Sequence, residues 1–186
     1  VDHIDTSQNW KERKKFCLKK VYHDLSELIT EAKDKKITTS LAVFQPTEIL
    51  DFYAEPVTRD WNPKQKDILA QQNLFEDKLK EVVRKLPYKF MFHYKDSSGK
   101  QSNMMIEDWE TGQLFWNCLA RHDGNEEKAI EDVRKKYFDD FAMTKDLYFY
   151  LGTTQKYHFS ARNPFIIIGT FHPKKENQMN LNLYAV

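Results

Sequence analysis

The feature that most constrains the fold is a strict alternation of side chains over residues 88–95, which read YKFMFHYK. Four aromatic residues share one face of an extended chain here, while lysines, a methionine and a histidine share the other. A period of two is typical of a strand with one covered face. A DSSGK turn with a glycine and a returning run, QSNMMIED, follow directly. Together they predict a β-hairpin over 88–107.

Two more apolar runs close the sequence, and they predict strands over 147–151 and 164–171. The second run, PFIIIGTF, is apolar on both faces, which is typical of a central strand. About a dozen polar residues, 152–163, separate the two runs. This segment is long for a hairpin connection, and long connections are often functional.

Helices are predicted between these strands. Asn62-Pro63 is an N-cap followed by proline at the first helical position, and it opens a helix over 63–86. Apolar residues at helical spacing predict two further helices, over 108–122 and 126–141, which the Asp123-Gly124-Asn125 turn separates.

The first 60 residues are predicted to be mainly helical. An apolar stripe predicts one long helix over 7–35, and the β-branched run 37–44 predicts a strand. Pro46-Thr47-Glu48 indicates the start of a short helical segment, and 57–61 indicates a short strand.

The resulting fold class is α+β, with a mainly antiparallel sheet packed against helices. The sheet comprises the 88–107 hairpin and the strands 147–151 and 164–171, beside an N-terminal helical extension. A length of 186 residues predicts a single domain over 1–186, with 1–60 as a possible extension and 173–186 as a mobile tail or a docking arm.

Composition limits the function classes. The net charge of +1 gives no global attraction to nucleic acid or to an anionic membrane. Cys17 and Cys118 are too far apart in sequence to form a disulfide scaffold, which favours the cytoplasm or another reducing intracellular compartment. No apolar run approaches the length of a membrane span, and the first residues lack the apolar stretch of a signal peptide, so we expect no membrane association.

The segment 152–163 is the first candidate binding site, because its polar side chains can donate hydrogen bonds and none is acidic. Such a cluster suits an anion, with an ordinary solvated loop as the alternative. The candidate anion-binding residues are Thr153, Thr154, Lys156, His158 and Arg162.

A basic patch near the N-terminus is the second candidate, and its alternative is a solvated helix face. Cations near a helix N-terminus oppose the helix dipole, so a sequence that carries them gains from an acidic partner. The patch comprises Lys11, Arg13, Lys14, Lys15, Lys19 and Lys20. Spare tyrosines, with Tyr148 and Tyr150 foremost, are candidates for base stacking or for ordinary core packing.

Catalysis and metal binding have weaker support. Glu107, Asp108 and Glu110 follow a strand as Mg²⁺ ligands of a nuclease would, but the lysine and the further acid of such a site are missing. Acids also gather at helix N-termini for electrostatic reasons. Cys118 and His122 have i, i+4 spacing without a second ligand pair, so neither a metal nor a cofactor is expected.

The residues therefore predict a non-catalytic binding module that contacts nucleic acid or another polyanion through the loop and the basic patch. A protein-interaction or scaffold subunit is the alternative, and a metal-dependent nuclease is the third. The partner is accordingly a nucleic acid or an acidic protein.

Overall fold

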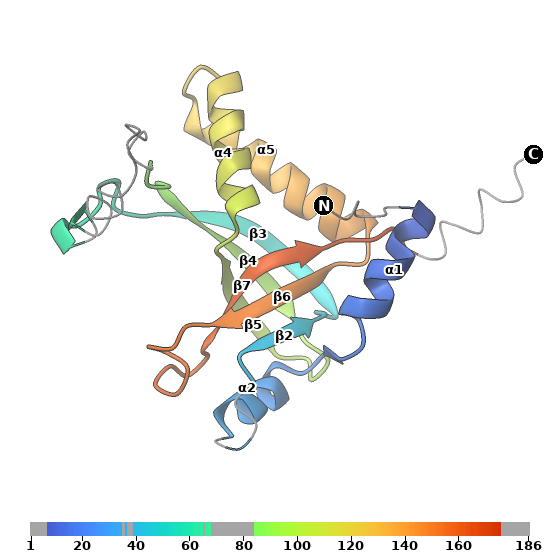
Figure 1. Cartoon of the computed structure of the whole chain (residues 1–186). Coiled ribbons are helices and arrows are strands. Elements are labelled where there is room, and N and C mark those ends of the chain that lie inside the picture. The colour runs from blue at the N-terminus through green and yellow to red at the C-terminus, as the bar shows by residue number, and fades with distance from the viewer. Residues whose placement is uncertain (1–6, 35, 37–38, 65, 68–83, 176–186) are drawn as a thin grey trace, which may run out of the picture.

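A computed structural model describes residues 7–34, 36, 39–64, 66–67 and 84–175. Its centre is a seven-stranded sheet with the order β1-β2-β6-β7-β5-β4-β3 (Figure 1). The strands are β1 Val21–Tyr22, β2 Leu41–Phe44, β3 Glu48–Pro56, β4 Tyr88–Lys95, β5 Gln101–Ile106, β6 Tyr148–Thr153 and β7 Phe165–Phe171. The helices are α1 Ser7–Cys17, α2 Leu25–Lys33, α4 Trp109–Arg121, α5 Glu126–Arg134 and the π-helix η1 Lys135–Ala142.

The predicted α+β class is confirmed. The sheet is mixed, because β1 pairs with β2 and β5 pairs with β7 in parallel, while the other neighbours are antiparallel. The β4–β5 hairpin lies where the alternation predicts it, and β7 occupies the central position that its two apolar faces predict. Within the described residues, no helix is long and apolar enough to cross a membrane.

The predicted single helix over 7–35 is wrong. The chain leaves the helix after Cys17, and β1 pairs Val21 with Val43 on β2 before α2 begins. The side chain of Asp24 caps α2, because it accepts hydrogen bonds from the backbone N–H groups of Ser26 and Glu27 at 2.7 and 3.2 Å. The apolar stripe continues across the break, so periodicity alone does not reveal it.

Two further predictions in the first 60 residues also fail. The segment after Pro46 is not helical but forms β3, an edge strand that pairs with β4. The predicted short strand at 57–61 has no strand geometry. With β1, β2 and β3 in the sheet, this part of the chain completes the sheet rather than forming a separate helical layer. The predicted helix over 63–86 lies largely outside the described residues, and its described start at Pro63–Lys64 is helical.

The helical layer over the inner face of the sheet follows the prediction closely. Asp108 caps α4 and Asn125 caps α5 through side-chain oxygens that accept backbone N–H groups. The predicted helix over 126–141 divides into the α-helix α5 and the π-helix η1, which follows it directly. This layer lies over β3 and β4 (Figure 1).

An aromatic core fills the space between the sheet and this layer. The Phe52 ring stacks on Tyr137 of η1, with centroids 4.9 Å apart. Phe44 of β2 and Tyr94 of β4 also touch, with centroids 5.5 Å apart, although three strands separate β2 from β4 in the sheet. A flat sheet would hold these strands about 19 Å apart. The sheet is therefore strongly curved around its aromatic inner face.

Candidate interaction site

The β6–β7 loop is anchored by its histidine. His158 is buried, and its Nε2 donates a hydrogen bond to the backbone oxygen of Ala32 at 2.7 Å. That carbonyl belongs to the last turn of α2, where carbonyl groups have no partner within the helix. The Nδ1 atom accepts from the Thr153 hydroxyl at 2.7 Å, and Lys33 donates to the Ala161 oxygen at 2.7 Å. His158 and Thr153 therefore hold the loop against α2 instead of facing a ligand.

The other candidate residues of the loop, Thr154, Lys156 and Arg162, are exposed. Lys156 lies over the ring of Tyr157, with its Nζ 5.0 Å from the ring centroid. The loop thus divides into an inner, structural part and an outer part that faces solvent.

The basic patch begins on α1 and ends after it. Its start on α1 lies away from this loop, whereas Lys20 at its other end pairs with Glu31 of α2, next to the Ala32 carbonyl that anchors the loop. The ring of Trp10 on α1 contacts Phe171, and Phe171 pairs with Tyr148. The loop leaves the opposite end of the β6–β7 hairpin, where Thr153 pairs with Phe165 (Figure 1). The cations at the start of α1 are therefore not brought together with the loop into one surface.

Several cations of the patch already have partners within the chain. Lys15 pairs with Glu12 at 2.8 Å, and Lys20 pairs with Glu31 at 2.9 Å. The Arg13 guanidinium lies over the ring of Trp10 at 4.6 Å from its centroid. The patch is thus an electropositive helix face whose charge is partly balanced.

The candidate catalytic acids do not gather around a common point. Asp108 accepts the backbone N–H of Glu110 at 3.2 Å as the α4 cap, and the Glu107 backbone N–H donates to Ile167 at 2.8 Å. Glu107 and Asp108 line a small pocket of about 340 Å³. Among the described residues, no group of three or more histidine, cysteine or acidic side chains could hold a metal ion.

The spaced pair at the end of α4, Cys118 and the C-cap residue His122, has a structural role. Cys118 is fully buried in the core. His122 contacts Asp132 of α5 through its Nε2 at 2.8 Å, and this hydrogen bond holds the pKa of the Asp132 carboxyl below its usual range. His122 therefore links the end of α4 to α5, while Cys118 packs in the core.

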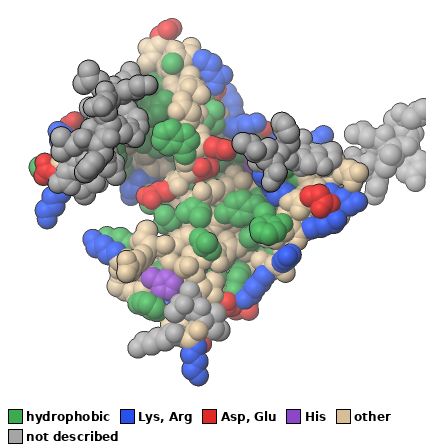
Figure 2. All heavy atoms as spheres, in the orientation of Figure 1, with side chains coloured by type: hydrophobic (Ala, Val, Ile, Leu, Met, Phe, Trp, Pro, Cys, Tyr) green, Lys and Arg blue, Asp and Glu red, His purple; other side chains and the backbone are tan. Residues whose placement is uncertain are grey.

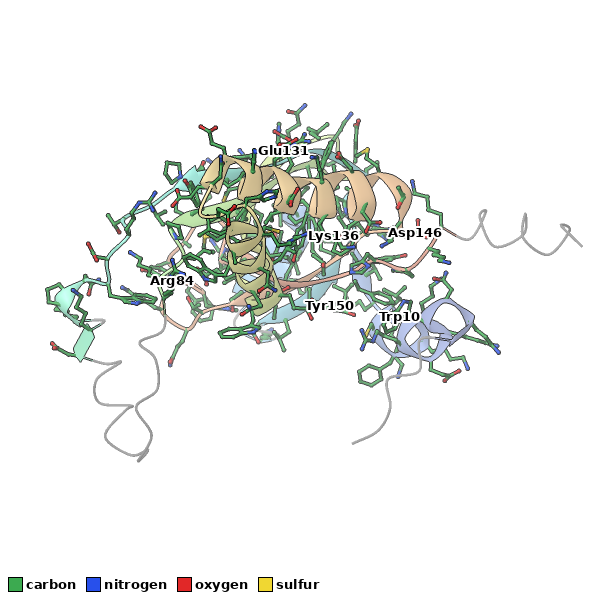
Figure 3. The ribbon with its side chains drawn as sticks, turned by 90° about the horizontal axis from the view of Figure 1, so that it is seen from above. Trp10, Arg84, Glu131, Lys136, Asp146 and Tyr150 are labelled. Atoms are coloured by element: carbon green, nitrogen blue, oxygen red, sulfur yellow. The ribbon has the colours of Figure 1, made fainter. Side chains whose placement is uncertain are left out.

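The outer face of the sheet carries a groove that the sequence did not single out. This face lies on the other side of the sheet from α5, as the positions of Tyr150 and Glu131 in Figure 3 show. Register places Val43 beside Tyr150 and Leu41 beside Gly152, so these side chains share the outer face. A Cβ atom on Gly152 would lie 3.1 Å from Ile168, so the missing side chain lets Ile168 lie across β6. The C-terminal end of α1 contributes Phe16 and Cys17 to the groove lining.

The groove has a volume of about 670 Å³ and a mostly apolar lining. Its lining residues are Phe16, Cys17, Lys19, Lys20, Tyr22, Glu31, Thr39, Leu41, Ala42, Val43, Tyr150, Leu151 and Ile168. Three large apolar side chains on it remain open to solvent: Phe16 is 76% exposed, Leu41 69% and Ile168 43%. Figure 2 shows hydrophobic side chains gathered over this face of the molecule. Exposed apolar groups that adjoin one another mark interaction surfaces, whereas scattered ones do not.

A polar network closes one wall of the groove. Glu31 accepts hydrogen bonds from the Tyr22 hydroxyl at 2.6 Å, from Thr39 at 2.7 Å and from Lys20 at 2.9 Å. These three donors lower the pKa of Glu31 to about 2. Burial, with the Cys17 thiol as a further contributor, raises the pKa of Tyr150 on the floor. The carboxylate is thus charged and fully engaged at neutral pH, and the tyrosine is neutral.

Sequence reasoning missed the groove because its parts come from distant segments. Leu41 lies in a run that was predicted correctly as a strand, and Ile168 lies in the run predicted as central. Phe16 was assigned to the continuous helix. The apolar residues on both faces of the last strand were the one feature of the sequence that indicates an apolar contact on its outer face.

The fold and this groove define an α+β domain with an exposed apolar groove on the outer face of its sheet. The chain belongs to a family described as a domain of unknown function, DUF8757, whose model matches residues 6–185. The comparisons with curated proteins and with solved structures gave no match.

Proposed function

We propose that this domain is a non-catalytic binding module that attaches to a protein partner through the groove. The observation that carries the proposal is the exposure of Phe16, Leu41 and Ile168 around one apolar floor. Completing the burial of a large apolar side chain contributes roughly 1–2 kcal/mol when about half or more of it starts exposed. Three neighbours of this kind supply the apolar centre that protein interfaces use.

A protein partner is favoured over nucleic acid by the distribution of the cations. A polyanion site needs its donors on one surface so that they meet successive phosphates. The loop cations Lys156 and Arg162 lie at one end of the β6–β7 hairpin and the start of α1 lies at the other. His158, the other predicted donor of the loop, already uses both ring nitrogens in hydrogen bonds to Ala32 and Thr153. The scaffold alternative from the sequence is therefore the better supported of the two.

A reducing compartment fits this function. Cys17 and Cys118 are free, and Cys118 is enclosed in the core. A buried cysteine of this kind packs as a small apolar side chain.

Site-specific photo-crosslinking tests the proposal. A photoreactive amino acid is placed at Leu41, on the rim of the groove, and in a matched chain at Lys128, an exposed residue of α5. Cells that carry each chain are irradiated, and the products are analysed by mass spectrometry. We expect one discrete protein adduct from position 41, absent from position 128 and lost when Ile168→Asp is added. The same adducts from both positions, or adducts to nucleic acid, would overturn the proposal.

A further inference from the structure

The groove carries more positive than negative charge. Its described lining residues include two lysines, Lys19 and Lys20, and one carboxylate, Glu31. The rest of the segment 11–20 carries further cations on α1 beyond the groove lining, with Glu12 as its single acid. An apolar surface with an excess of positive charge is complementary to apolar groups that are accompanied by negative charge.

The Glu31 carboxylate is already paired with donors inside the protein. Lys20 donates to both of its oxygens, at 2.9 and 3.0 Å, and Tyr22 and Thr39 donate to one of them. The Lys20–Glu31 pair is therefore locally neutral. It offers a partner neither a strong attraction nor a strong repulsion.

Lys19 is the cation that remains on the rim. Its Nζ lies 5.5 Å from the ring centroid of Phe16, and within the described part of the chain it forms no ion pair. Its amine is exposed and stands next to the most exposed aromatic ring of the groove. A carboxylate that approaches beside an apolar anchor meets this amine without displacing an internal partner.

Building on the proposed function, we infer that the groove binds an acidic segment of its protein partner. A large apolar side chain of that segment fits against Tyr150 and Ile168, and a neighbouring aspartate or glutamate pairs with Lys19. The apolar contact supplies most of the affinity. The Lys19 charge favours segments with an acidic residue beside the apolar side chain, and it increases the association rate.

Selection from a library of random linear peptides against the full chain tests this inference. Selected peptides are labelled and their Kd values are measured by fluorescence anisotropy at low and high salt. We expect enrichment of acidic residues next to Leu, Phe, Ile or Trp. Lys19→Glu should weaken binding of these peptides about three- to tenfold and should improve binding of versions with lysine in place of the acids. Lys128→Glu, the same charge change on α5, should leave both unchanged.

Each outcome separates the inference from the proposed function. Enrichment of neutral or basic peptides that still require Ile168 would overturn the acidic preference and leave the protein-binding groove standing. Peptides that bind equally to Ile168→Asp would overturn both. A single-stranded oligonucleotide that displaces the peptide with the same dependence on Lys19 would overturn the protein partner in favour of a polyanion. Circular dichroism of each variant shows whether the fold is retained.

Discussion

His158 should stabilise the fold rather than bind a ligand, and His158→Ala tests this directly. The substitution removes the donor to the Ala32 carbonyl and the acceptor for the Thr153 hydroxyl, both at 2.7 Å. A buried carbonyl left without a partner costs about 1–3 kcal/mol, and the second hydrogen bond contributes about 0.5–1.5 kcal/mol. We therefore expect the free energy of unfolding to fall by about 1.5–4.5 kcal/mol, with a fall in Tm of roughly 3–18 °C.

Urea denaturation followed by tryptophan fluorescence measures this change. The matched control is the double variant Lys156→Ala and Arg162→Ala, which alters two exposed residues of the same loop and should change the unfolding free energy by less than about 0.5 kcal/mol. His158→Gln, whose amide can donate to Ala32, should recover part of the loss. A His158→Ala chain as stable as the unmodified protein would refute the assignment of this histidine to the α2 terminus.

Three further predictions concern the N-terminal part of the chain. The pKa of Glu31 falls from 4.5 to about 2 on folding, so its stabilising contribution is present above pH 4.5 and is lost as the pH falls towards 2. The difference in unfolding free energy between the unmodified chain and Glu31→Gln should shrink over that range, and a constant difference would contradict the network. Asp24→Ala should cost about 1 kcal/mol in thermal or urea unfolding through loss of the α2 cap, and no cost would argue against the break before α2. Asn9 exchanges two hydrogen bonds of 2.8 Å with the Lys174 backbone, so Asn9→Ala should speed amide exchange across α1, and unchanged exchange would contradict that anchor.

The elements predicted best from the sequence are those in which buried and exposed residues repeat at one constant spacing. β4 alternates without interruption, and its buried residues Phe90, Phe92 and Tyr94 follow that alternation. β3 was mistaken for a helical segment because a register shift between Ile49 and Asp51 breaks the alternation. The shift places Ile49 and Phe52, three residues apart, on the buried face, and a spacing of three is also typical of a helix.

The sequence contains a local indication of the break between α1 and α2, but the apolar stripe that runs across it favoured a single helix. Asp24 and Glu27 have the spacing of a capping box, and the Asp24 side chain does cap α2. β1 is two residues long and exists because it pairs with β2, which no local pattern encodes. Tertiary pairing, rather than propensity, thus decides this part of the chain.

The candidate site was harder to predict than the fold, for a physical reason. The groove joins α1, β2, β6 and β7, and these become neighbours only through the order of strands in the sheet. Charge and donor content, by contrast, are visible in sequence whatever their partners are. They drew attention to His158 and Lys20, which the folded chain uses internally.

Hydrogen exchange of the full chain, alone and with the protein captured from position 41, tests the central claim most directly. The account predicts slower amide exchange along β2 and along the β6 and β7 segments that floor the groove, with no change in the loop at 154–163. Protection confined to that loop and to the start of α1, with the groove unaffected, would contradict it.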